Sequence, residues 1–195
     1  MQQTKSPEFS LARPLPSAVE VLKAVLLSPQ TFYRGFSTEG PIREPVYFVL
    51  LVGAVTGILS AVVTLASGLI FGEVTPAIVG YTVLQAFLFA ALSPAIVAAI
   101  AAVYLLSIRT LVGKVGSFQE VYRMAAYAYG AMIFAWIPGV YALSITYMLM
   151  ILMGFGIRTI YRTSFLTAVV TVLVGFVPCA MGFIVLSMAV ARPFG

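Results

Sequence analysis

Residues 45–72 read PVYFVLLVGAVTGILSAVVTLASGLIFG and contain no charged side chain. A helix of about 20 apolar residues crosses the hydrocarbon core of a bilayer, so this stretch predicts a transmembrane helix over residues 45–71. The rest of the chain agrees, because 62% of its 195 residues are hydrophobic and only 9% are charged. Soluble domains carry about 25% charged residues. The sequence therefore predicts an all-α integral membrane protein.

Four further apolar runs follow, and charge decides how often they cross the membrane. The run Val74–Ile108 is too long for one upright helix and contains Pro76 and Pro94. If this run crosses once, ten of the eleven Lys and Arg side chains lie in the cytoplasm; if it crosses twice, the split is about even. Cytoplasmic loops are enriched in Lys and Arg. We therefore predict a five-helix transmembrane bundle with a cytoplasmic N-terminus and the C-terminus outside.

The membrane domain is predicted over residues 45–190 and is followed by a tail, 191–195. Its remaining spans are predicted at 94–112, 120–137, 140–157 and 164–190. Residues 77–91 are predicted to form an outer interfacial or half-inserted helix, with a break near Ser93-Pro94 because proline cannot donate the helix hydrogen bond. One long kinked helix is the alternative.

Residues 1–44 are predicted to form a cytoplasmic segment. Ser17 and Glu20 have the spacing of a capping box, in which each side chain satisfies a free backbone N–H at a helix start. Aromatic side chains follow this helix and are interpreted as membrane-interface anchors: Phe32, Tyr33 and Phe36. Residues 17–36 are therefore interpreted as an amphipathic helix on the inner membrane surface. The alternative is that this segment docks on the protein's own cytoplasmic loops.

The stretch RMAAYAYGAMIFAWIPG, residues 123–139, supplies most of the predicted third span. Tyr127 and Tyr129 point about 200° apart on a helix, so we expect at most one of them to face the bundle. Gly130 permits a close helix approach beside them. Trp136 is expected near the outer interface, where indole rings favour the headgroup level.

Two local patterns support the predicted helices. Ser117 and Glu120 form a second capping box at the start of the third span. In the first span, Gly53, Gly57 and Ala61 form a row of small residues, which lets helix backbones approach closely in lipid. This row is interpreted as a packing face, either within the bundle or against another protein.

Ionisable side chains inside a span would mark an ion path, and we predict none near a span centre. Four arginines are instead expected at span ends, where their side chains can snorkel to the interface: Arg109, Arg123, Arg158 and Arg162. The most polar side chain within the uncharged runs is Gln85. It is expected either to pair with a backbone carbonyl or to line a small cavity.

Side chains that serve catalysis and metal binding are scarce. The chain has no His, its six acidic residues are all Glu, and it has one Cys. Because most acid–base, nucleophilic and metal chemistry uses His, Asp or Cys, we predict no enzymatic activity, no catalytic residue and no metal site. No pattern names a cofactor-binding residue, and bound lipid is the one ligand left open. The net charge of +5 is interpreted as an orientation signal rather than as a nucleic-acid footprint.

Three stretches have the order and spacing of a known family. LLSPQTFYRGF at 26–36 is a leucine-rich, proline and aromatic lead-in to the first span. Residues 93–140 contain, in order, a span, a glycine-rich basic turn, a helix that begins with Ser-Phe and is rich in tyrosine and alanine, and an Ile-Pro-Gly end. Residues 157–178 contain a loop and the start of the final span. Over about 24–187 the chain thus resembles the Ypt-interacting-protein (Yip) domain family of small polytopic membrane proteins. The resemblance implies five spans and a cytoplasmic N-terminus.

The resemblance also implies a function class. Eukaryotic members of the family bind Rab-type GTPases and usually carry an acidic aromatic-Gly-Pro motif before the first span. The stretch STEGPIREP, 37–45, keeps Gly40-Pro41 but lacks the Asp and the aromatic residue, which weakens the expectation of GTPase binding. The chain looks more like a prokaryotic-type member, in a cytoplasmic (inner) membrane.

We therefore expect a non-enzymatic adaptor, assembly or accessory subunit of a membrane complex. Its expected partners are the lipid bilayer and either other membrane protein subunits or a second copy of the chain. The alternative is a component of a transporter or channel for a small solute or lipid.

Overall fold

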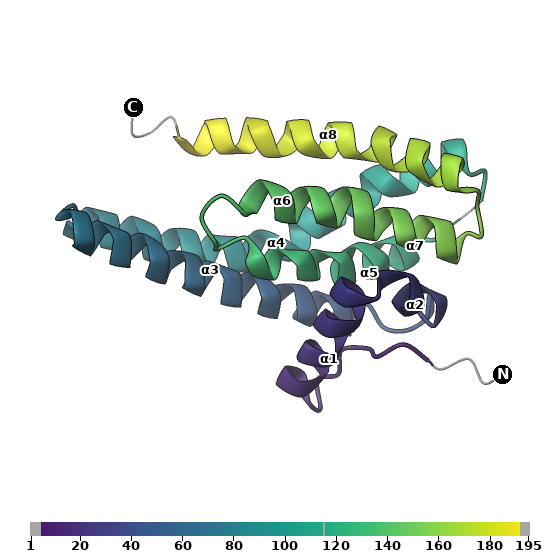
Figure 1. Ribbon diagram of the computed structural model, residues 1–195, viewed down its shortest axis with the longest axis horizontal. Coiled ribbons are helices and arrows are strands. Elements are labelled where there is room, and N and C mark those ends of the chain that lie inside the picture. The colour runs from purple at the N-terminus through teal and green to yellow at the C-terminus, as the bar shows by residue number, and fades with distance from the viewer. Residues whose placement is uncertain (1–4, 115, 192–195) are drawn as a thin grey trace.

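A computed structural model describes residues 5–114 and 116–191, with side chains described as far as Gly182. These residues fold into α-helices joined by short turns, with one 3-10 helix (η1) and one π-helix (η2) inserted (Figure 1). The elements are α1 Pro14–Leu27, α2 Pro29–Arg34, α3 Arg43–Phe71, α4 Pro76–Leu111, α5 Phe118–Ala128, η1 Tyr129–Phe134, α6 Tyr141–Thr146, η2 Tyr147–Leu152, α7 Met153–Ile160 and α8 Phe165–Ala191. The predicted tail, 191–195, lies outside the described residues from position 192 onward.

Four helices in the described part are long and apolar enough to cross a membrane. They are α3, α4, the continuous stretch Tyr141–Ile160 that joins α6, η2 and α7, and the described part of α8. The all-α membrane class is therefore confirmed. The predicted third span, 120–137, corresponds to α5 and η1, which are not among these four.

The predicted break at Ser93-Pro94 is wrong, because α4 is one continuous helix of 36 residues that runs through Pro94. Proline has no N–H, so the carbonyl of Ala90, four residues earlier, loses its helical donor. The Ser93 hydroxyl replaces that donor and lies 2.8 Å from the Ala90 carbonyl oxygen. The separate helix predicted over 77–91 is thus the first half of α4, and the single long helix is the arrangement observed.

The helix formed by α5 and η1 occupies the centre of the molecule. All residues from Val121 to Met132 are buried, because α1, α3, α4 and α7 contact α5 and η1 on different sides. The expectation that at most one of Tyr127 and Tyr129 faces the bundle is therefore wrong. The two rings do leave the helix in different directions, but both directions meet protein, and the residues are 0% and 3% exposed.

The small-residue row of α3 packs against α4 within the same chain. A Cβ atom added at Gly57 would lie 2.7 Å from the Ala86 carbonyl oxygen, and one added at Gly53 would lie 2.8 Å from the Ser93 hydroxyl. Neither position can hold a larger residue unless the helices separate. Gly53 and Gly57 thus lie in an intramolecular contact, and Ala61 follows one turn later with its side chain half-buried.

Hydroxyl groups of α3 and α4 each donate to one backbone carbonyl of the two irregular helices. The Thr56 hydroxyl donates to the carbonyl of Met132 in η1 at 2.9 Å, and the Tyr104 hydroxyl donates to the carbonyl of Leu149 in η2 at 2.6 Å. In a lipid environment no water is present to accept or donate these bonds. These bonds tie α3 to η1 and α4 to η2 inside the bundle, and the Thr56 bond adds to the one that the Met132 carbonyl accepts from the Ala135 N–H at 2.9 Å.

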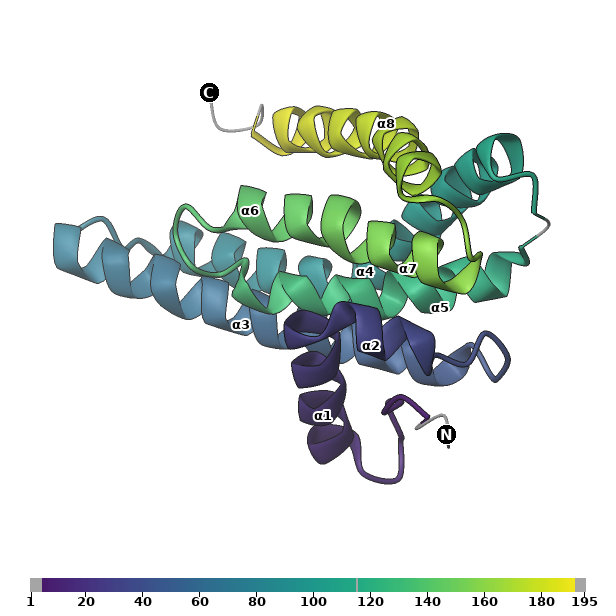
Figure 2. The same cartoon turned by 45° about the vertical axis from the view of Figure 1, so that its right-hand side comes forward.

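The N-terminal helices pack on the side of the bundle opposite to α8 (Figures 1 and 2). Val21 and Val25 of α1 are fully buried, as are Phe32 and Tyr33 of α2 at 2% exposure. Phe32 and Tyr33 are therefore core residues rather than interface anchors, and Phe36 is half-buried. Residues 17–36 are docked on the protein itself, as in the alternative, but they pack against α5, η1 and α7 rather than on loops.

Only one of the two predicted capping boxes begins a helix. Ser117 is the N-cap of α5, and its hydroxyl accepts a bond from the Glu120 N–H at 3.1 Å. Ser17 instead lies one turn inside α1, which begins at Pro14, and its hydroxyl donates to the Arg13 carbonyl at 2.7 Å. The predicted cap at Ser17 and Glu20 is wrong because the prolines at 14 and 16 start the helix earlier.

Candidate functional site

Arg123 lies in the first half of α5 and is 0% exposed. The sequence predicted that this side chain would snorkel to the membrane surface, and that prediction is wrong. Residues that precede α3 in the chain cover it completely, so that its charge is neutralised inside the protein. We call Arg123, Glu8 and the turn residues 36–41 the Arg123 site.

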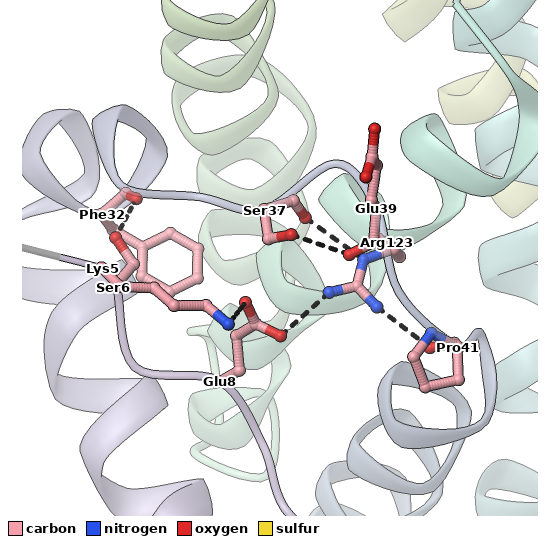
Figure 3. Close-up of polar contacts among 8 residues, drawn as sticks. All are labelled: Lys5, Ser6, Glu8, Phe32, Ser37, Glu39, Pro41 and Arg123. Atoms are coloured by element: carbon pink, nitrogen blue, oxygen red, sulfur yellow. Dashed lines mark hydrogen bonds and ion pairs between the residues drawn. The ribbon is translucent and has the colours of Figure 1, made fainter. Parts of the chain in front are cut away.

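Each nitrogen of the Arg123 guanidinium has a partner in the N-terminal segment (Figure 3). Nη2 donates to Oε2 of Glu8 at 3.1 Å, Nη1 donates to the carbonyl of Pro41 at 2.9 Å, and Nε donates to the carbonyl of Ser37 at 3.3 Å. Arginine presents five N–H donors in a rigid fork, so one side chain can bind a carboxylate and two carbonyls at once. Glu8 also lies 3.4 Å from the ammonium of Lys5, at the edge of the site.

Gly40 allows the turn to approach the guanidinium. Its φ angle is +130°, and a Cβ atom added there would lie 3.0 Å from Nη1 of Arg123. The amide of Gln119 donates to the Gly40 carbonyl, which fixes the same turn from the start of α5. The Gly40-Pro41 pair noted in the sequence therefore lies in the turn that binds Arg123, with Pro41 and Ser37 as the acceptors.

An aromatic cluster extends from the Arg123 site into the bundle. The guanidinium carbon of Arg123 lies 5.9 Å from the centroid of the Phe36 ring. Tyr127, one turn after Arg123, has ring centroids of Phe32, Phe36 and Phe48 within 5.3–5.9 Å. Aromatic pairs at such distances and steep angles are favourable. The cluster joins α2, α3 and α5 with little contact to water.

Further bonds tie the N-terminal helices to the later part of the chain. The hydroxyl of Tyr33 donates to the Met124 carbonyl at 3.4 Å, and that of Tyr147 donates to the Leu26 carbonyl at 2.9 Å. Burial, with a smaller contribution from Tyr147, raises the pKa of the Tyr33 hydroxyl, so this group stays protonated and remains a donor. Before α1, the Ser6 hydroxyl donates to the Phe32 carbonyl at 2.5 Å.

The Arg123 site binds the N-terminal segment of its own chain rather than a substrate. The Arg123 guanidinium is bonded to backbone carbonyls and a carboxylate of its own chain, and solvent does not reach it. Breaking a buried ion pair by removing one partner costs about 3–5 kcal/mol because a buried charge is left alone. The Arg123 site therefore fixes residues 5–41 to the membrane bundle.

The structure brings some of the predicted site residues together and separates others. Tyr127, Phe32, Tyr33 and Phe36 belong to or adjoin the Arg123 site. Gly130 faces α1, where an added Cβ would lie 2.9 Å from a methyl carbon of Leu22. The α3 row of Gly53, Gly57 and Ala61 lies at the α4 contact instead, and Trp136 is half-buried in the turn that follows η1.

The sequence analysis missed Arg123 and Glu8 as a pair. They are 115 residues apart, and no spacing rule joins an N-terminal carboxylate to the middle of the chain. The one available signal in the sequence was a Gly-Pro turn before the first span together with an arginine directly before the apolar run that begins at Met124.

A model of the Yip1 domain matches residues 23–188. The chain belongs to the Yip1 domain family. The match confirms the resemblance predicted over 24–187 and covers Arg123 and the Gly40-Pro41 turn, whereas Glu8 precedes the matched Yip1 region. Neither a curated protein nor a solved structure matches the chain.

Proposed function

We propose that this Yip1-family chain is a non-enzymatic adaptor, assembly or accessory subunit of a membrane complex. The observation that supports it is a set of three exposed apolar side chains on α1, which lies outside the candidate spans. Leu15, Val19 and Leu27 are 65%, 49% and 79% exposed. Leu15 and Val19 are one turn apart, whereas the exposed Lys23 lies between Val19 and Leu27. Neighbouring exposed apolar side chains such as Leu15 and Val19 mark surfaces that bind a protein or a membrane. The outer side of α1 is the proposed binding surface, and its partner is another membrane protein subunit or a second copy of the chain.

The Arg123 site makes this surface part of the membrane domain. Since residues 5–41 are bonded to α5, α1 holds a fixed position relative to the membrane helices. A partner bound to α1 would therefore be held in a defined orientation against the bilayer. A rigid connection of this kind suits an accessory subunit better than a flexible tether does.

We further propose a prokaryotic cytoplasmic membrane, with the N-terminal segment in the cytoplasm and the C-terminus outside. The charge distribution supports this orientation, because ten of eleven Lys and Arg residues then lie on the cytoplasmic side. The two ends of the described chain lie at opposite ends of the bundle (Figure 1), which supports an odd number of crossings such as the proposed five.

Native purification in a mild detergent tests the adaptor role. The wild-type chain should retain a partner at fixed stoichiometry, and the double variant Leu15→Glu/Val19→Glu should lose it. Gln30→Glu/Thr31→Glu adds the same two charges at exposed positions of α2 and should keep the partner. A homogeneous, partner-free chain that conducts a solute across liposomes would contradict the proposal.

That result would favour the alternative, a component of a small-solute or lipid transporter or channel. A polar cavity bordered by α3, α4 and α6 supports this alternative. Transport would require this cavity to open to both sides of the membrane in turn, and liposome flux measures that directly.

A further inference from the structure

A cavity of about 350 Å³ lies between α3, α4 and the turn that leads into α6, away from the Arg123 site. Six of its lining residues carry polar side chains: Thr56, Ser60, Thr64, Thr82, Gln85 and Tyr141. An adjacent groove that shares Ala61 and Ala86 with it is lined only by apolar residues. Polar side chains thus gather on one side of the α3–α4 pair.

Helical spacing explains why these polar groups meet. Thr56, Ser60 and Thr64 follow one another at four-residue intervals on α3, and Thr82 and Gln85 are three residues apart on α4. Residues at such spacing lie on one face of a helix. The close contact of Gly57 with Ala86 brings the two faces together, and the small side chains around it leave the space open.

One of these groups has an unmet hydrogen-bonding need. Thr82 is 3% exposed, and its hydroxyl has no hydrogen-bond partner among the described residues. The Thr56 hydroxyl differs, since it donates to the Met132 carbonyl. A buried polar group without a partner is costly and, beside a polar cavity, indicates that a guest supplies the missing bond.

The lining residues define the chemistry of that guest. None of them carries a charge, so they offer no counter-ion for a phosphate or an ammonium group. Hydroxyls and the Gln85 amide each supply both donors and acceptors, which matches a group that also does both. The volume lies within the range of small-molecule pockets, about 300–1,000 Å³.

We propose that this cavity binds an uncharged polyhydroxyl group, such as glycerol or a sugar. The group is either the headgroup end of a lipid or a free polyol. This inference does not depend on the adaptor role, because the cavity and the outer surface of α1 share no residue.

Native mass spectrometry of the purified full chain with phosphatidylglycerol and phosphatidic acid tests the lipid source. The two lipids share an anionic phosphate, and only the first carries a headgroup glycerol. Saturation-transfer NMR with free glycerol tests the soluble source. Preference for phosphatidylglycerol assigns the site to a lipid, and an NMR signal without that preference assigns it to a free polyol.

Thr82→Val and Gln85→Leu should each weaken the binding about three- to tenfold, the range for one hydrogen bond. Thr110→Val, at the other end of α4 and exposed, should leave it unchanged. Thr82→Val should also fold as well as the wild type, because it removes a hydroxyl that has no protein partner. Absence of binding with every probe, or binding that neither cavity variant weakens, would overturn the proposal and leave a cavity that holds only water.

Discussion

At the scale of single residues, Arg123 carries a positive charge to a place that water does not reach. Its three polar partners all come from residues 8–41, so the charge is stable only while that segment is docked. Docking and charge neutralisation are thus one event. Variants at this site should change the position of the N-terminal segment more than they change the helices around it.

Arg123→Met should destabilise the docked segment by about 3–5 kcal/mol, because the partly buried Glu8 would keep only the exposed Lys5 as its partner. The Ser37 and Pro41 carbonyls would also lose their donor. Limited trypsin digestion should then cut rapidly after Lys23 and Arg34, which precede Ala24 and Gly35. Arg43→Met, at an exposed position at the start of α3, serves as the matched control and should digest like the wild type. Equal protease resistance in both variants would show that Arg123 does not hold the segment.

Glu8→Gln should have a smaller effect of about 1–3 kcal/mol, since an amide oxygen can still accept from Nη2 while the charge is lost. Thermal unfolding of the two single variants and of Glu8→Gln combined with Arg123→Met measures their coupling. We expect the double variant to be less destabilised than the sum of the singles, because both remove one interaction. Strict additivity would place the two residues in separate interactions.

Gly40→Ala should lower stability by about 1–3 kcal/mol, as φ values near +130° suit glycine almost alone. The added methyl group would also press on Nη1 of Arg123. Gly113→Ala provides the comparison, because Gly113 has a φ of +71° and open space around its Cα. Denaturation of both variants should show the larger loss at position 40; an equal loss would mean that contact with Arg123 contributes nothing.

At the scale of elements, the α3–α4 pair depends on the absence of side chains at its contact points. Gly57→Ala should push a methyl group against the Ala86 backbone and cost roughly 1–3 kcal/mol by overpacking. Gly80→Ala introduces the same methyl group into α4 where nothing lies within 4 Å, and it should be neutral or stabilise the helix by about 0.5–1 kcal/mol. Thermal unfolding in detergent distinguishes them, and similar behaviour of the two variants would contradict the packing argument.

The elements were predictable from the sequence to different degrees. Uncharged runs between basic clusters located α3, the joined α6–α7 stretch and α8, because the bilayer requires such runs. The continuity of α4 was not predictable from Pro94, since it depends on the Ser93 hydroxyl replacing a lost donor. The start of α1 was misplaced for a related reason, because a serine inside a helix and a serine that caps one have the same sequence pattern.

The site was much less predictable than the fold. Tyr127 and Gly130 stood out by their surroundings in the sequence, but their role depends on α1 and α2 covering α5 from one side. Arg123 was assigned to the membrane surface because sequence rules describe a single helix in lipid. The N-terminal segment changes that environment, and only contacts between distant parts of the chain reveal it.

At the scale of the whole molecule, the turns should alternate between the two sides of the membrane. In a Cys179→Ala background, the single variants Glu73→Cys and Pro138→Cys should react with an impermeant maleimide in intact cells. The variants Glu39→Cys and Thr163→Cys should react only after the cells are lysed. Labelling of Glu73→Cys and Glu39→Cys from the same side would contradict the proposed orientation. Labelling of Pro138→Cys only from the cytoplasm would contradict five membrane crossings.

The bond between Glu8 and Arg123 also sets an order of events during synthesis. The two residues are 115 positions apart, and at about 5–20 residues per second the ribosome needs roughly 6–23 s to make the intervening chain. During that time α5, η1 and α7, which contact α1 and α2 in the folded chain, do not yet exist. The N-terminal segment can therefore reach its docked position only after α5 has been made, and the speed of translation sets how long its apolar faces wait for these helices.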